Sequence, residues 1–194
     1  MLRNTMFTGA LALALISPSM AIGQVSAGST GSMSATDVGA SPMTSVSATD
    51  YVKLAADSDM YEVQSSRLAL MRSKRDDVKS FAREMIADHT TTTKSLMAAL
   101  KNNERTIAKP ATRLSAENAS KIALLKKAPK ATFDDLYLQQ QAQAHQTAWS
   151  LHKGYATDGT DPALKQVAST AVPVIERHLG HAKQILPASL TPAQ

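Results

Sequence analysis

The sequence contains no cysteine among its 194 residues. It therefore has no disulfide bond, no thiolate nucleophile and no thiolate metal ligand, although exported proteins commonly contain disulfides. A transition-metal site in this chain has to be built from His, Asp, Glu or Met side chains. The same absence excludes a lipid anchor on a cysteine that follows a leader segment.

Motifs of two common enzyme classes are also missing. The sequence has no glycine-rich loop that would cradle phosphate groups, and no serine lies in a nucleophile-elbow motif. After residue 49 it has almost no glycine and no alternating runs of Val, Ile and Thr, so strands are not expected. These absences disfavour nucleotide-binding and serine-hydrolase functions.

The first 23 residues have the layout of a secretory signal peptide. Arg3 precedes an apolar run from Met6 to Ile16, and small residues follow. The run is too short to span a membrane, and no later stretch is long and apolar enough to do so. Cleavage after Ala21 or after Gly23 would suit the small residues equally well. We therefore predict a periplasmic or secreted protein without a transmembrane span.

The charge of the chain is moderately basic. The sequence holds 21 Lys and Arg and 16 Asp and Glu. Because Arg3 is removed with the signal peptide, the net charge of the mature protein is about +4. Export argues against nucleic acid as a partner. The cations are spread along the chain, which favours solvated helix faces with, at most, weak attraction to an anionic envelope surface or a protein partner.

Composition divides the mature chain into three parts. Residues 24–48 consist mainly of Ser, Ala, Gly, Thr and Met with one charge at Asp37, so they predict a flexible tether that cannot bury enough apolar area to fold. Residues 49–187 are rich in the helix formers Ala, Leu, Lys and Gln and predict one all-helical domain. Residues 188–194 form a C-terminal tail.

Capping signals and breaks mark four long helices and one short helix in this domain. The long helices are expected from about Asp50 to Ser73, from about Asp76 to Lys101, from after Thr132 to near residues 157–161, and from Pro162 to before Pro187. The short helix is expected at Ser115–Ala128. Ser47 or Thr49, the pair Thr132 and Asp135, and Asp161 are the expected N-caps. Short turns after the first and third long helices, with a long middle connection, predict a ferritin-like four-helix bundle with a long crossover that contains the short helix.

Each long helix carries a potential metal ligand near its midpoint. Glu62, His89 and His145 lie close to the centres of the first three helices, and His178 lies about 6 Å beyond the centre of the fourth. The orientation of His178 is the clearest, since an apolar stripe shares its face, whereas His89 is expected at the edge of the core and the faces of His145 and Glu62 stay open. The sequence thus predicts a metal site at Glu62, His89, His145 and His178.

The types of these residues favour certain metals. Two or three imidazoles and one carboxylate suit zinc, copper or nickel. A di-iron site is disfavoured because its Glu-x-x-His pairs are absent: Ala87 follows Glu84, and Leu179 follows Glu176, at the third position. Glu84, Asp88 and Glu176 could orient imidazoles from outside the site. The competing interpretation is that each histidine is a half-buried helix residue with a hydrogen bond to a neighbour or water.

Four segments of the chain resemble a bacterial family known as domain of unknown function 4142, whose members are placed in the ferritin-like superfamily and often labelled predicted outer-membrane or periplasmic proteins. The segments are ATDYVKLAADSDMYEVQSSRLAL, VKSFAREMIADHT, FDDLYLQQQAQAHQTAW and DPALKQVASTAVPVIERHL. The matching residues are Met60, Glu62, Asp88, His89, Tyr137, His145, residues 161–164, Pro173 and His178.

The resemblance implies a ferritin-like helical bundle in the cell envelope, and it implies no established activity. His152 and His181 are additions in this chain, and the Asn-Pro common before the second helix is missing. The favoured function is binding of a transition metal or small ligand at the central His and Glu residues. A structural or stress-related envelope protein without metal is the alternative, and an enzyme would need turnover that depends on the histidines.

Overall fold

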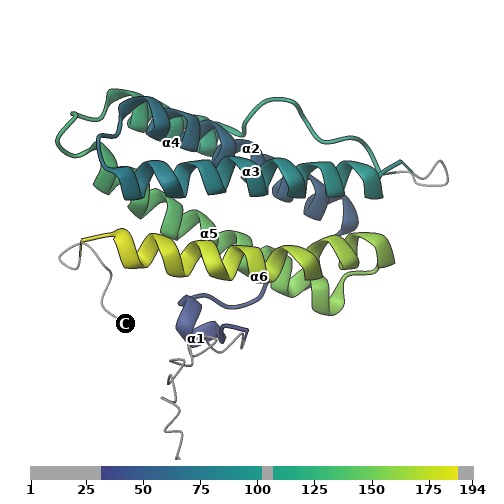
Figure 1. Ribbon diagram of the computed structural model, residues 1–194. Coiled ribbons are helices and arrows are strands. Elements are labelled where there is room, and N and C mark those ends of the chain that lie inside the picture. The colour runs from purple at the N-terminus through teal and green to yellow at the C-terminus, as the bar shows by residue number, and fades with distance from the viewer. Residues whose placement is uncertain (1–31, 102–106, 188–194) are drawn as a thin grey trace, which may run out of the picture. The chain divides into compact units, whose positions relative to one another are not determined.

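The computed structural model describes residues 32–101 and 107–187 (Figure 1). These residues form helices and no strands, which confirms the all-helical prediction. The helices are α1 (Ala35–Val38), α2 (Ala48–Arg72), α3 (Asp76–Ala99), α4 (Ala116–Lys127), α5 (Phe133–Asp158) and α6 (Pro162–Ile185). The predicted signal peptide, the first residues of the predicted tether and the C-terminal tail lie outside the described residues. No described helix is both long and apolar enough to cross a bilayer.

A predicted N-cap residue precedes each of α2, α5 and α6, and two of the three cap their helix through a side-chain hydrogen bond. The Ser47 side chain accepts a hydrogen bond from the Asp50 amide at 3.0 Å, and Oδ1 of Asp161 accepts from the next two free amides of α6. Thr132 stands at the N-cap of α5 as predicted, but the predicted capping pair with Asp135 is wrong: the Thr132 side chain makes no capping hydrogen bond, and its hydroxyl donates to the carbonyl of Pro129 instead. α5 instead begins with two acids, Asp134 and Asp135, which suit the positive end of the helix dipole.

The long helices pack pairwise. α2 packs against α3 and α5, and α6 packs against α5 and α3, while α4 packs mainly against α2. Residues 73–75 alone connect α2 to α3, and residues 159–161 alone connect α5 to α6, so each pair is joined by a tight turn. In Figure 1, α3 and α6 run along each other, which brings the midpoints of helices distant in sequence to one level.

Arg72 fixes the end of α4 against the end of α2. Its guanidinium donates to the carbonyl oxygens of Leu125, Lys126 and Ala128, and it lies 4.6 Å over the Phe133 ring. These contacts add hydrogen bonds to carbonyls at the C-terminal end of α4, where a helix runs out of backbone donors of its own. One side chain therefore holds together the ends of α2 and α4 and the start of α5.

Buried polar residues separate two apolar clusters in the core. One cluster includes Phe81, Met85 and Tyr137, and the other includes Leu96 and Leu164. Between them lies a set of buried ionisable residues, named here the polar layer: Asp59, Glu62, His89, His145 and His178. The apolar clusters on both sides fix the helices, so the positions of the polar layer are set by packing that does not involve it.

Residues 32–47, predicted as part of a flexible tether, form defined structure along α5. Ser34 and Asp37 make a reciprocal capping box that starts α1, and Val38 is fully buried. The amide of Met43 donates to the carbonyl of Ser150 at 2.8 Å. Composition did not reveal this segment because a local capping box and one buried valine replace a long apolar pattern.

Gly154 allows this segment to lie against α5, and its replacement provides a test. A Cβ at Gly154 would overlap the backbone of Met43, whereas a Cβ at Gly180 in α6 would meet nothing within 4 Å. We expect Gly154→Ala to lower the free energy of unfolding by about 1–3 kcal/mol. Gly180→Ala, the matched control, should be neutral or stabilising by up to about 1 kcal/mol. Equal effects of the two substitutions in urea unfolding would contradict the close contact.

Candidate metal centre

Three buried imidazoles meet in the polar layer. His89 of α3, His145 of α5 and His178 of α6 are 3%, 0% and 0% exposed, and one nitrogen of each lies within 4.8 Å of one nitrogen of the others. Their ring centroids are 5.6, 5.4 and 5.3 Å apart, which makes a nearly equilateral triangle. All three side chains point inward, so the open question about the face of His145 is answered and the edge position expected for His89 is corrected.

Hydrogen bonds fix which nitrogen of two imidazoles carries a proton. Nδ1–H of His145 donates to the carbonyl oxygen of Gln141 at 2.7 Å, and Nε2–H of His178 donates to Oδ2 of Asp88 at 2.9 Å. Both acceptors can only accept, so the neutral rings carry lone pairs on their other nitrogens. Those nitrogens, Nε2 of His145 and Nδ1 of His178, face each other at 3.3 Å. Two lone pairs at this distance repel unless a proton or a cation lies between them.

The 3.3 Å separation also suits a tetrahedral metal ion. Two nitrogens that each lie about 2.0–2.1 Å from zinc, at a tetrahedral angle, are about 3.3–3.4 Å apart. The separation of this pair of nitrogens already matches such a geometry.

His89 is oriented by a residue that sequence reasoning missed. Its Nδ1 lies 2.8 Å from Oδ1 of Asp59, and Asp59 also accepts hydrogen bonds from the hydroxyls of Thr92 and Thr93. Nε2 of His89 has no hydrogen-bond partner among the described residues. A carboxylate behind one nitrogen of a histidine is the usual support for a metal-ligating imidazole. The one signal in the sequence for Asp59 was its place on the helix, since it lies one turn before Glu62 and therefore on nearly the same face of α2.

Glu62 lies beside the triangle rather than within it. Its side chain is 1% exposed, and neither carboxylate oxygen accepts a hydrogen bond from the described residues. Oε1 lies 3.8 Å from Nδ1 of His145. Burial raises the pKa of Glu62 to about 7, although the nearby His89 charge favours the ionised form. The structure thus brings nitrogens of three of the four predicted residues within 4.8 Å of one another and places the fourth next to them.

Burial and the neighbouring carboxylates favour one positive charge in the polar layer, on His89. Burial, and then the charge of His89, lower the pKa of His145 well below its ordinary value, and the same two causes lower that of His178 to about 4. Burial also opposes a charge on His89, but the hydrogen bond and charge of Asp59, with help from Glu62, raise its pKa overall. At neutral pH, His145 and His178 are therefore neutral imidazoles.

The three acids expected to orient imidazoles behave differently. Asp88 holds His178, as described, and Glu84 accepts from Nδ1 of His181 at 3.1 Å. Glu176 instead accepts hydrogen bonds from Trp149 and Ser32 and contacts no imidazole in the described structure.

His152 lies in a different environment. Its Nδ1 is 3.1 Å from the Tyr51 hydroxyl, and the Tyr51 ring stacks on Tyr155 with centroids 4.1 Å apart. Burial lowers the pKa of His152 to about 4. This histidine is a neutral core residue outside the triangle, which makes it a useful control.

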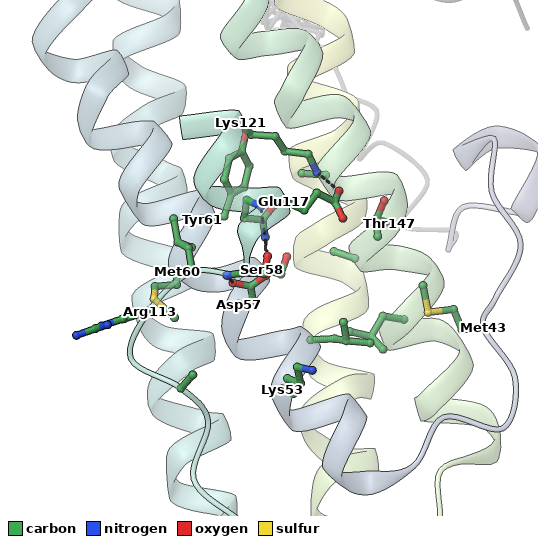
Figure 2. Close-up of a pocket in the computed structure, with 18 residues that line it drawn as sticks. Met43, Lys53, Asp57, Ser58, Met60, Tyr61, Arg113, Glu117, Lys121 and Thr147 are labelled. Atoms are coloured by element: carbon green, nitrogen blue, oxygen red, sulfur yellow. Dashed lines mark hydrogen bonds and ion pairs between the residues drawn. The ribbon is translucent and has the colours of Figure 1, made fainter. Parts of the chain in front are cut away.

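A cavity of about 530 Å³ opens between α2, α4 and α5 (Figure 2). None of the three imidazoles lines it. Its acids already have partners: Glu117 pairs with Lys121 at 2.8 Å, and Asp57 accepts from the Ser115 amide and the Asn118 side chain. Figure 2 shows Lys121 extending above Tyr61 to reach Glu117. The cavity is therefore separate from the candidate metal centre.

Comparison with known proteins identifies the family. Residues 33–185 match the family described as Domain of unknown function (DUF4142), so the chain belongs to it. The match includes the segment before α2 and contains the whole polar layer. No curated protein and no solved structure is significantly similar to the chain.

The unpartnered carboxyl of Glu62 predicts that this residue lowers the stability of the metal-free protein. Replacing it with leucine should raise the free energy of unfolding by about 1–2 kcal/mol in the presence of a chelator, because a buried acid without partners is costly. The folded-state pKa is raised, so the wild type loses stability as pH rises toward and through about 7. The gain in Glu62→Leu should therefore be larger at pH 8 than at pH 5.

Glu62→Gln is the matched control, since it retains a buried polar group without the charge. Its difference from the wild type should vary with pH as that of Glu62→Leu does, because both variants lack the titrating carboxyl, but it should gain less stability. A Glu62→Leu protein that is less stable than the wild type at pH 8, without metal, would contradict this account of Glu62.

Proposed function

We propose that this protein binds one transition-metal ion, zinc, copper or nickel, through His89, His145 and His178, with Glu62 as the fourth ligand. The supporting observation is the pair of lone-pair nitrogens that face each other at 3.3 Å, each fixed by a hydrogen bond on the far side of its ring. A cation between the two nitrogens would relieve their repulsion, and imidazole is a ligand that suits zinc, copper and nickel.

Glu62 can join the imidazoles by rotating its side chain. The rotation breaks no hydrogen bond, because neither oxygen accepts one from the described residues. The carboxylate would bring the donor set to three nitrogens and one oxygen, which suits a four-coordinate zinc site. Its charge would also partly neutralise the ion in a core where an uncompensated charge is costly.

The proposed architecture is a ferritin-like four-helix bundle whose second and third long helices are joined by a crossover that contains α4. It is supported by the tight turns within the α2–α3 and α5–α6 pairs and by the long connection between those pairs. We also propose export to the periplasm, supported by the leader-like residues 1–23. Three imidazoles and one acid do not resemble the carboxylate-rich donor set of di-iron proteins, so binding rather than ferroxidase chemistry is proposed.

Metal uptake tests the proposal directly. Protein purified without a metal-binding tag should take up one equivalent of Zn²⁺. At a free Zn²⁺ concentration of about 100 times the dissociation constant, the free energy of unfolding should rise by about 2.7 kcal/mol, and the melting temperature should rise with it. Alanine at His89, His145 or His178 should abolish stoichiometric uptake, as measured by elemental analysis after gel filtration.

His152→Ala is the matched control, because it removes a buried imidazole outside the triangle. It should lower stability but keep the uptake. If the wild type binds none of zinc, copper and nickel at neutral pH, the metal proposal fails and the interpretation as a structural envelope protein takes its place.

The affinity should depend on pH in a defined direction. The pKa of Glu62 is about 7 and that of His89 is raised, so both carry protons below neutral pH and must lose them to bind metal. Between pH 8 and pH 6, Zn²⁺ affinity should fall by about tenfold to a hundredfold. Competition against a chromophoric chelator measures this, and the slope should be shallower in Glu62→Gln. An affinity that is constant over this range would exclude these groups as ligands.

A further inference from the structure

The cavity between α2, α4 and α5 lies where α4 stops covering α2. Ser115, the N-cap of α4, lies beside Asp57 of α2, and Arg72 at the end of α2 binds carbonyls at the end of α4. The two helices therefore run parallel. Because α2 starts at Ala48 and α4 begins only beside Asp57, the first turns of α2 are left without α4 next to them.

The walls of this cavity are mainly apolar. Leu54 of α2 lines the cavity and is 43% exposed, one of only three large apolar side chains in the described part of the chain that are exposed. Ala144 and Ala148 of α5 line it as well, and their small side chains leave room that larger residues would fill. The volume of about 530 Å³ falls within the range of about 300–1,000 Å³ that is usual for small-molecule sites. The cavity can therefore accept an apolar body of this size.

The charged residues that line the cavity leave two cations without an acidic partner. Both oxygens of Asp57 accept hydrogen bonds from the start of α4, and Glu117 pairs with Lys121. Lys53 and Arg113 also line the cavity, and neither forms an ion pair within the residues that the structure describes. A ligand with a negative group would therefore find a free cation here, whereas a cationic ligand would find only acids that already have partners.

The two free cations lie away from the wall that α5 forms. Figure 2 shows Arg113 and Met60 on one side of the drawn residues, Met43 and Thr147 on the other, and Lys53 below them. Both cations are exposed to solvent. A charged group that lies beside them can stay partly hydrated, so it avoids most of the cost of burying a charge.

We propose that this cavity binds a small amphipathic anion, namely an apolar chain that carries one carboxylate. The chain packs against Leu54 and Ala148, and the carboxylate lies at the exposed side with Lys53 and Arg113. Burial of the chain contributes most of the affinity, and the exposed ion pairs contribute a smaller part that selects the sign of the charge. A small inorganic anion would leave the apolar walls in water. The proposal goes beyond metal binding and does not depend on it, because none of the three imidazoles lines the cavity.

Calorimetric titration of the full-length protein tests the proposal. The probes are decanoate, decyltrimethylammonium, which carries the opposite charge on the same chain, and acetate, which lacks the chain. At about pH 7.5 and about 0.15 M NaCl, decanoate should bind one to one and at least about tenfold more tightly than decyltrimethylammonium, and acetate should not bind. The double variant Lys53→Gln/Arg113→Gln should bind decanoate about fivefold more weakly than the wild type.

Two matched controls use residues outside the cavity. Leu54→Glu should abolish decanoate binding, whereas Leu124→Glu, at another exposed leucine that does not line the cavity, should stay within about twofold of the wild type. Arg67→Gln removes an exposed cation of α2 outside the cavity and should also stay within about twofold. Urea unfolding shows whether Leu54→Glu is folded. The two cation substitutions change exposed side chains, so they test the site even if Leu54→Glu is unstable.

Three results would overturn the proposal. Decanoate could show no saturable binding, or it could bind with an affinity that is unchanged in Leu54→Glu and in the double cation variant, which would place it elsewhere on the protein. Decyltrimethylammonium could bind as tightly as decanoate, in which case the cavity does not select a negative charge. None of these results bears on the metal centre, and a protein that takes up no metal would leave this proposal standing.

Discussion

Two neutral imidazoles that present lone pairs to each other are the constraint on which the rest of this account depends. Nε2 of His145 and Nδ1 of His178 are 3.3 Å apart, and each ring is fixed by a hydrogen bond from its other nitrogen. Rotation of His145 would lose a buried hydrogen bond, which costs about 1–3 kcal/mol, and rotation of His178 would lose a partly buried one. A cation between the two nitrogens replaces repulsion with coordination. On the proposed function, binding of a metal ion would therefore relieve a repulsion that the packed helices already impose.

Apolar side chains pack on both sides of the polar layer and hold its helices in place. Apolar clusters that include Phe81 and Met85 at one end, and Leu96 and Leu164 at the other, hold α3 and α6 in register. The acids Asp59 and Asp88 then orient two of the imidazoles from outside the triangle. Such supports limit the reorganisation that binding requires. The same architecture explains why Glu62 can stay unpartnered: its helix is fixed by neighbours that do not need its carboxylate.

Much of the helical structure could be predicted from the sequence, but the contacts between helices could not. The predicted ends of α2 to α6 agree closely with the structure because Ser47, Asp161 and the breaks between helices are local signals. His178 was oriented correctly by the apolar stripe of α6. The face of His145 could not be assigned. Because α5 is buried on several faces, the spacing of its apolar residues does not single out one face as the inner one. Asp59 was missed because its role depends on its distance from His89, on another helix.

The most direct test of the central claim is the position of the ion itself. A crystal of the protein grown with Zn²⁺, with data collected at the zinc absorption edge, should show one anomalous peak at about 2.0–2.1 Å from Nε2 of His89, Nε2 of His145 and Nδ1 of His178. Nδ1 of His145 should still donate to the Gln141 carbonyl. A peak elsewhere in the molecule, or a direct hydrogen bond between His145 and His178 in crystals saturated with zinc, would contradict the account.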